Sequence, residues 1–175
     1  KRRGPKTLRG VKVAWLASAG NPGDPEVSVV TAAALDHMDR EGAIIEAITL
    51  DFVSLERHFL VILQSLLAAR VGSHLDSFGE RIDATLVEAV RKGRQHSAMA
   101  LHEAGFARTQ CFATLQTVFD QHDLLISPTL SAPPLPIDMD LDGALTIGGR
   151  AAGTVRAAWY PYTYPMNLTG HPALS

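Results

Sequence analysis

Cysteine is nearly absent from this sequence. The 175 residues include a single one, Cys111, which excludes an internal disulfide framework and favours a reducing, cytoplasmic compartment. Its neighbours, Gln110 and Phe112, carry no positive charge that would activate a thiol. We therefore expect Cys111 to be a small buried apolar residue and not a nucleophile.

Motifs for metals, nucleotides and the nucleophile of α/β-hydrolases are also missing. The chain contains no CxxC pair and no HExxH, and its seven histidines do not follow the spacing of metal ligands. Gly143, Gly148 and Gly149 form neither a phosphate-binding loop nor a dinucleotide fingerprint, and GxSxG is absent. We expect no metal site and no cofactor.

Neither sign of charge is in large excess, since the formal net charge is −2. This balance argues against nucleic acid or a membrane surface as a partner. We find no uncharged run long enough to span a bilayer, and we expect no signal peptide. Positive charge is concentrated only in the basic start KRRGPK, which predicts a solvated arm over residues 1–7.

The whole sequence contains 46% apolar and 19% charged residues, a composition typical of one globular domain.

The first half of the chain predicts a strand, a helix and a second strand. Residues 8–17 alternate apolar side chains as a strand does, and residues 43–50 form a second β-branched run. Between them, Asp24 is suited to cap a helix that starts at Pro25, and Gly42 is suited to end it. Short connections between such elements indicate a right-handed parallel crossover.

The second half predicts helices followed by a short strand. Apolar side chains recur at helical spacing, and Pro128 stops a buried strand. Prolines, glycines and acidic residues then suggest a long irregular connection over residues 131–153. The expected fold class is α/β, with a mixed, partly parallel sheet covered by helices. The expected helices cover residues 52–71, 82–90 and 97–121, and the strand covers residues 123–127.

The sequence ends on WYPYTYPMNLTGHPALS, residues 159–175, which contains four aromatic residues and three prolines. Such a stretch suits neither a regular helix nor a strand that faces solvent. We expect it to form a loop that leads into a buried strand.

Two stretches together resemble the later half of the amidase-signature enzymes. One is GRQHSAMALHEAGFARTQCFATLQTVFDQHDLLISPTL, residues 93–130, and the other is the terminal NLTGHPALS. Upstream, LRGVKVAWL and the DPEV…AAALDHMDREGAIIE unit also look like the corresponding part of that family. The resemblance covers nearly the whole chain from about Leu8 onward.

This resemblance implies an amidase. Enzymes of the family cleave amides through a serine nucleophile that a second serine and a lysine activate, with backbone amides as the oxyanion hole. These residues lie upstream of the matching region, so no catalytic residue is carried over to this chain. The resemblance implies a C-terminal fragment, inactive alone, of an enzyme that hydrolyses a small carboxylic-acid amide. Its expected partners are the missing N-terminal half and, through exposed strand edges, a possible second copy.

Tyr160 and Tyr164 are the candidate substrate-binding residues. They precede Asn167 by seven and three residues, at positions that help to wall the acyl chamber in relatives such as the fatty acid amide hydrolases. An aromatic wall suits an apolar acyl or aryl group. The alternative is that both rings pack in the core with their hydroxyl groups hydrogen-bonded.

Two further functions stay open. Relatives that transamidate glutamyl-tRNA carry a substrate-clamping arginine one helical turn after Arg108, and this chain has Phe112 there. A phenyl ring cannot pair with a carboxylate, which speaks against the transamidase. Arg108 itself is expected to form an ion pair on a solvated face. The second alternative is a non-catalytic binding or scaffolding module.

Overall fold

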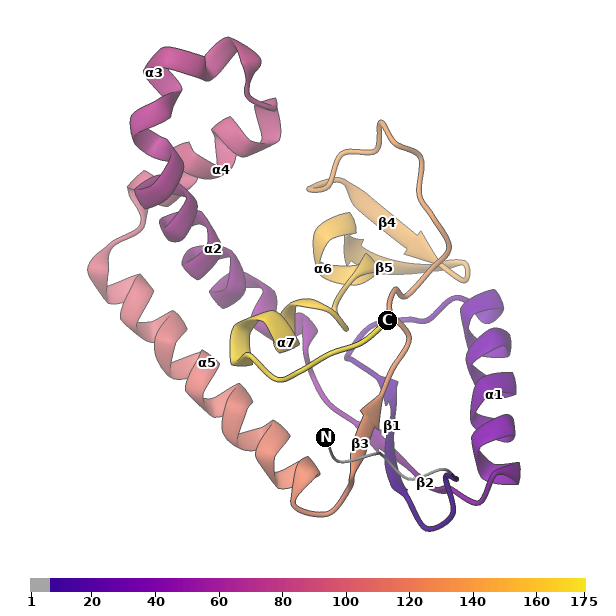
Figure 1. The fold of residues 1–175 in the computed structure, drawn as a ribbon. Coiled ribbons are helices and arrows are strands. Elements are labelled where there is room, and N and C mark those ends of the chain that lie inside the picture. The colour runs from indigo at the N-terminus through magenta and orange to yellow at the C-terminus, as the bar shows by residue number, and fades with distance from the viewer. Residues whose placement is uncertain (1–6) are drawn as a thin grey trace.

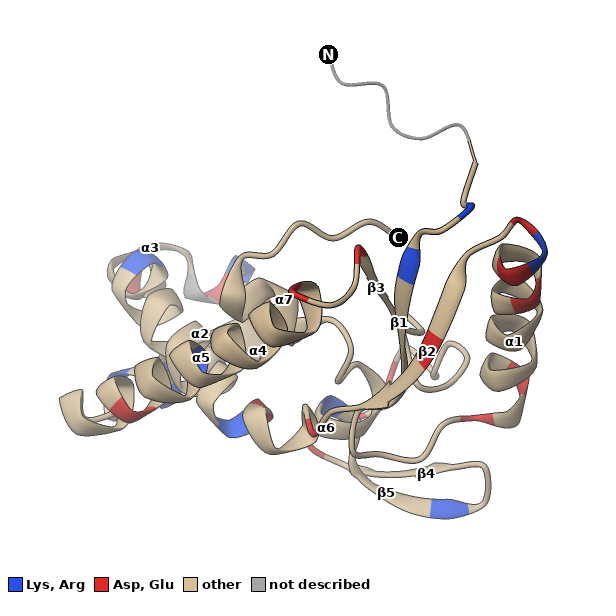
Figure 2. Cartoon of the chain, turned by 90° about the horizontal axis from the view of Figure 1, so that it is seen from below, with Lys and Arg blue, Asp and Glu red and all other residues tan. Residues whose placement is uncertain are grey.

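The computed structural model describes residues 7–175. The basic arm expected at the start therefore lies, up to residue 6, outside the described residues. In Figures 1 and 2 one helix, α1 (Pro25–Arg40), lies on one side of a small sheet, and a layer of several helices lies on the other side. In the described part of the chain, charged residues of both signs are scattered over the elements (Figure 2).

The predicted crossover unit is confirmed. Strand β1 (Lys12–Ser18), helix α1 (Pro25–Arg40) and strand β2 (Ile44–Thr49) follow one another, and the strands pair in parallel. The Asp24 carboxylate accepts a 2.9 Å hydrogen bond from the Glu26 amide and so caps α1. Gly42 has a φ of 91°, the left-handed conformation that ends a helix without strain.

The third strand, β3 (Leu124–Ile126), pairs in parallel with the other edge of β1, which gives the order β2-β1-β3. The Asp123 carboxylate, just before β3, accepts a 2.9 Å hydrogen bond from the Lys12 amide at the start of β1. Both outer strands leave one edge unpaired within the described residues, and Ile44 and Leu124 are exposed there. Exposed edges of this kind were expected from the sequence.

The helical layer consists of three long helices and short turns of helix between them. Helix α2 packs against both α4 and α5. Gly93 makes the α2–α4 contact possible, because a Cβ atom there would lie 2.0 Å from the Gln64 carbonyl oxygen. Asp83 caps α4 and Ser97 caps α5. The elements are η1 (Val53–Leu55), α2 (Glu56–Val71), η2 (Gly72–His74), α3 (Leu75–Phe78), η3 (Gly79–Arg81), α4 (Ala84–Gln95) and α5 (Ala98–Phe119).

One run of helical residues, Val53–Phe78, is longer than the helix expected over residues 52–71, and it is apolar. The 26 residues of Val53–Phe78 would suffice, by length and composition alone, to cross a membrane. The core helix of a soluble protein meets the same criterion when it is mostly buried, but here only 6% of the apolar window is buried, although α2 packs against α4 and α5. The absence of a membrane partner therefore stays a prediction.

The prediction of an irregular connection over residues 131–153 is wrong from residue 144 onward. Strands β4 (Ala144–Ile147) and β5 (Arg150–Thr154) form an antiparallel hairpin there. Gly148 and Gly149 make its two-residue turn, with φ values of 56° and 76°, as a tight primed turn requires. The Gly-Gly pair was the available sequence signal, but the surrounding prolines and aspartates concealed it.

Two apolar clusters form the core. One joins β1 and the segments after it to α5, and the other lies between the hairpin and α6. The first contains Leu16, Ala19, Phe52, Cys111, Leu115 and Tyr162, and the second contains Ala132, Leu145, Ile147, Val155 and Ala158. Cys111 is buried as expected, and burial raises the pKa of its thiol, which keeps it protonated and unreactive.

Candidate substrate-binding site

The aromatic terminal stretch begins at the last residue of one short helix and contains a second short helix, in place of the expected loop and strand. Helix α6 (Val155–Trp159) begins after Thr154, whose hydroxyl accepts a 3.2 Å hydrogen bond from the Ala157 amide. Helix α7 (Tyr164–Thr169) has Pro165 in its first turn, where a missing amide hydrogen breaks no helical bond. Gly170, with a φ of 74°, ends it. No strand follows in the described residues.

Tyr164 lies in the core of the described chain. Its side chain is 1% exposed, and its ring stacks on Phe59 of α2 with centroids 5.2 Å apart. Its hydroxyl donates a 2.6 Å hydrogen bond to the Phe52 carbonyl oxygen. Burial is the main cause of a large rise in the pKa of Tyr164, so the hydroxyl stays neutral. This geometry matches the packing alternative for Tyr164, and its contact with a substrate stays a prediction.

Tyr160 lies beside Tyr164 but is only half buried. The two rings meet edge to face with centroids 6.5 Å apart. The Arg156 Nη1 atom donates a 3.3 Å hydrogen bond to the Tyr160 hydroxyl oxygen. Burial raises the pKa of Tyr160, and Arg156 opposes this rise. Tyr160 is therefore a half-buried aromatic ring with a neutral, hydrogen-bonded hydroxyl, and its contact with a substrate stays a prediction.

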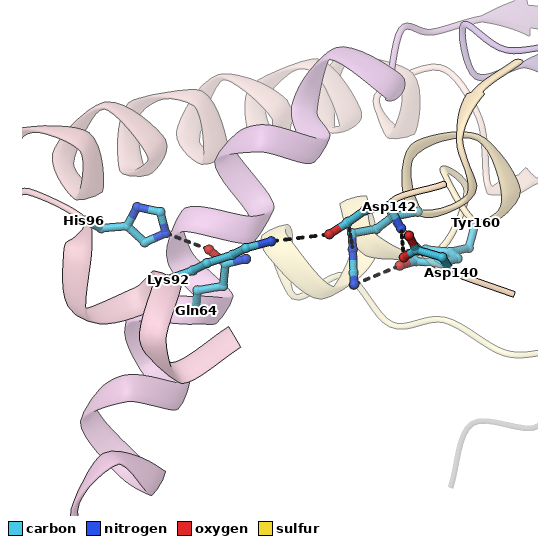
Figure 3. A network of polar contacts seen from close by, with 7 residues as sticks. Gln64, Lys92, His96, Asp140, Asp142 and Tyr160 are labelled. Carbon is cyan, nitrogen blue, oxygen red and sulfur yellow. Dashed lines mark hydrogen bonds and ion pairs between the residues drawn. The ribbon is translucent and has the colours of Figure 1, made fainter. Parts of the chain in front are cut away.

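A network of charged side chains adjoins Tyr160 and joins the hairpin region to α4 (Figure 3). Asp142 accepts a 3.3 Å hydrogen bond from the Lys92 Nζ atom and a 3.5 Å bond from the Arg156 Nε atom. The Asp140 carboxylate accepts a 2.9 Å bond from the Asp142 amide and holds the turn in place. Sequence reasoning missed this network because its members lie 50 and 14 residues apart.

Glu56, at the start of α2, belongs to the same electrostatic environment. Burial raises the pKa of its carboxyl group, Arg156 lowers it and Asp142 raises it further. The environment therefore combines two cations, Lys92 and Arg156, with the carboxyl groups of Glu56 and Asp142. Because the opposite charges neutralise one another, the surroundings of Tyr160 carry little net charge.

The described residues contain no assembled nucleophile. In residues 7–175, no hydrogen bond joins a serine or cysteine to a histidine or lysine side chain. The same residues hold no cluster of histidine, cysteine and carboxylate side chains that could bind a metal ion. No hydrogen bond between the described residues therefore places a serine hydroxyl against a histidine or lysine side chain that could act as its base.

The two residues connected with the transamidase alternative lie on α5. Arg108 is exposed, and no ion pair joins it to another described residue. Phe112 stacks on His171 with centroids 5.0 Å apart, so it packs against the segment that follows α7. Neither residue lies in the network around Tyr160.

Among family models, curated protein sequences and solved structures, the chain matches only solved structures. No protein-family model matches the chain, and no curated protein sequence matches it significantly. A bacterial aryl acylamidase of the amidase signature family superposes with a TM-score of 0.77 at 21% identity, over 95% of this chain. An amidase superposes with a TM-score of 0.77 at 16% identity, over 94%. The allophanate hydrolase of Kluyveromyces lactis superposes with a TM-score of 0.56 at 16% identity, over 96%.

These similarities define the fold. The chain has the fold of part of the amidase signature enzymes, with a parallel sheet covered by helices. It spans 36% of the length of the aryl acylamidase chain and 37% of that of the amidase chain. The fold expected from the terminal and central motifs is therefore confirmed.

Proposed function

We propose that the chain is the C-terminal part of an amidase that hydrolyses a small carboxylic-acid amide. The observation that supports this most strongly is the superposition on the aryl acylamidase, which extends over 95% of the chain. The serine, second serine and lysine of the proposed mechanism belong to a part of the enzyme outside residues 1–175. A serine needs such a base because its hydroxyl is a weak nucleophile at neutral pH.

In this proposal the chain supplies one wall of the substrate pocket. The Tyr160 ring contacts the acyl or aryl side of the amide, and Arg156 fixes the ring through the 3.3 Å hydrogen bond to its hydroxyl. The neutralised charges of Lys92, Asp142 and Glu56 keep this wall polar without selecting an ion. A fixed wall favours reaction because it holds the scissile bond in line with the nucleophile.

Hydrolysis of aryl and alkyl amides by the product of the complete open reading frame tests this proposal. We expect turnover by that product and none by residues 1–175 alone. Replacement of Tyr160 by Ala should lower kcat/KM for aryl amides by about tenfold or more, and Tyr160→Phe should lower it less because the ring remains. Turnover by residues 1–175 would place a nucleophile in the chain and contradict the proposal. An open reading frame limited to these residues, without turnover, would favour the non-catalytic module instead.

A further inference from the structure

His122 lies in the turn between α5 and β3, and its side chain is only 7% exposed. Two acceptor atoms face its ring. The Nδ1 atom lies 3.0 Å from the Val118 carbonyl oxygen in the last turn of α5, and the Nε2 atom lies 3.1 Å from the Glu46 Oε2 atom on β2. The ring therefore joins the end of a helix to an edge strand of the sheet.

Both contacts together require a charged ring. A carbonyl oxygen and an ionised carboxylate only accept hydrogen bonds, so each ring nitrogen must donate. Neutral imidazole carries one N–H group, and only the imidazolium carries two. The Glu46 side chain is 67% exposed, and an exposed glutamate is ionised at neutral pH. The geometry therefore matches a protonated His122 beside an ionised Glu46.

The end of α5 also favours a cation at this place. The C-terminal end of a helix carries a partial negative charge, which a nearby cation stabilises. The last turn of α5 contains no basic residue, and its C-terminal cap is Asp120. Asp123, which follows His122 directly, is a second carboxylate. A protonated His122 supplies the positive charge that the last turn of α5 lacks.

Lys12, the one charged residue of β1, does not replace His122 as the partner of Glu46. Ala14 pairs with Glu46 in the parallel register, so the side chains of Lys12 and Glu46 leave the same face of the sheet. No ion pair, however, joins Lys12 to a carboxylate within residues 7–175. Lys12 therefore opposes the imidazolium only by repulsion at longer range, and Glu46 pairs with His122.

His171 is another histidine that packs against the last turns of α5, and it provides an internal control. Its ring lies 5.3 Å from that of Phe119 and hydrogen-bonds with Gln116 and Thr169. Both partners are uncharged, and each carries a donor as well as an acceptor. Unlike His122, His171 therefore has no partner that requires a charged ring.

We propose that His122 is a pH-sensitive latch that ties the end of α5 to β2 through Val118 and Glu46. In acid, below about pH 6.5, the imidazolium holds both contacts. At higher pH the ring loses one proton and the Glu46 contact opens, because water can solvate this exposed carboxylate instead. The helix end stays capped, since the His122 amide also donates to the Val118 carbonyl oxygen at 3.0 Å.

The sign of the effect follows from proton linkage. A histidine that gains acceptors on folding stabilises the native state below its unfolded value of about 6.5, and this stability is lost as pH rises. The latch lies near the amino ends of the strands, since β1 begins at Lys12 and β3 at Leu124. Open α/β sheets bind ligands beyond the carboxyl ends, so the inference is independent of the proposed amide hydrolysis.

A double-mutant cycle of His122→Gln and Glu46→Gln in the 175-residue chain tests the latch. Glutamine keeps hydrogen-bonding groups but carries no charge. Urea denaturation at about pH 5.5 should give a coupling of about threefold or more in the folding equilibrium constant, and the coupling should disappear at about pH 8.5. The control cycle of His171→Gln with Glu46→Gln should give no coupling at either pH.

Nuclear magnetic resonance of the ring nitrogens gives a second measurement, which does not require the buried His122→Gln variant to fold. Glu46→Gln changes only an exposed side chain. Ring nitrogen signals distinguish charged from neutral imidazole, and correlation with the backbone assigns His122 among the seven histidines. At about pH 6.5 the ratio of charged to neutral His122 should be lower by about threefold or more in Glu46→Gln, and that of His171 should not change.

Three outcomes would overturn the inference: an equal His122–Glu46 coupling at both pH values, an equal pH-dependent coupling with His171, or a His122 ratio that Glu46→Gln leaves unchanged. None of them bears on the amidase proposal, whose measurement is turnover by the product of the complete open reading frame. Absence of turnover likewise leaves the coupling experiment unaffected.

Discussion

The Tyr164 hydroxyl and the Phe52 carbonyl oxygen lie 2.6 Å apart although 112 residues separate them in the chain. This hydrogen bond joins α7 to the segment between β2 and α2. Replacement of Tyr164 by Phe keeps the ring on Phe59 and removes one of two donors to the Phe52 carbonyl oxygen, which still accepts a 3.0 Å hydrogen bond from the Leu55 amide. We expect a loss of about 1–1.5 kcal/mol in the free energy of unfolding, the upper part of the range for one neutral hydrogen bond because this one is buried, measured by urea denaturation.

Tyr160→Phe is the matched control, since the Tyr160 hydroxyl is half buried and accepts only the 3.3 Å bond from Arg156. Its loss should be smaller, about 0.5–1 kcal/mol. A larger loss for Tyr160→Phe than for Tyr164→Phe would show that the buried hydrogen bond is not the main contribution of these hydroxyl groups.

Alkaline pH should destabilise the fold through Tyr164. Burial raises the pKa of this residue far above its usual value, whereas in the unfolded chain it titrates at about 10. Above that pH the unfolded state binds fewer protons than the native state, so stability falls as pH rises, by at most about 1.4 kcal/mol per pH unit for this group. Urea denaturation on both sides of about pH 10 measures the slope.

Tyr164→Phe should make this alkaline slope shallower, and it should not abolish it, since burial also raises the pKa of Tyr160 and Tyr162. An unchanged slope in the variant would mean that Tyr164 ionises in the native state as readily as in the unfolded chain.

Two glycines inside helices should respond to alanine in opposite directions. A Cβ atom at Gly93 would lie 2.0 Å from the Gln64 carbonyl oxygen, so Gly93→Ala must push α4 away from α2. We expect a loss of about 1–3 kcal/mol or more. At Gly105, in α5, no described atom lies within 4 Å of the added carbon, and Gly105→Ala should stabilise the chain by about 0.5–1 kcal/mol. Thermal and urea unfolding of the pair measure both effects.

The Lys92–Asp142 ion pair should contribute little to stability. Burial alone would raise the pKa of Asp142, but Lys92 and Arg156 outweigh it and lower the pKa overall. The Asp142 side chain is 58% exposed, so solvent screens the pair. A double-mutant cycle of Lys92→Gln and Asp142→Asn should give a coupling of about 0.2–1 kcal/mol.

Acid should remove this small contribution. A carboxyl group whose pKa is lowered on folding stabilises the fold above its unfolded value of about 3.9 and ceases to do so as pH falls through the folded value. A coupling that persists unchanged well below that pH would exclude the ionised Asp142 carboxylate as its source.

Local sequence signals predicted the crossover unit and the helix ends. Asp24, Ser97 and Gly42 act through hydrogen bonds and backbone angles within a few residues, so their effect can be read from the sequence alone. The amidase-signature fold could also be predicted from the sequence, because the resemblance depends on the order of motifs along the chain and needs no knowledge of their contacts. The Gly148–Gly149 turn had a local signal as well, although neighbouring loop-forming residues concealed the hairpin.

Long-range contacts could not be predicted in this way. Whether Tyr160 is half exposed and Tyr164 buried depends on α2, and whether Asp142 meets Lys92 and Arg156 depends on how the hairpin region packs against α4. The sequence by itself determined the elements and their order, since these follow from local propensities. Only the tertiary structure decided which polar groups face one another, because that depends on packing between distant segments.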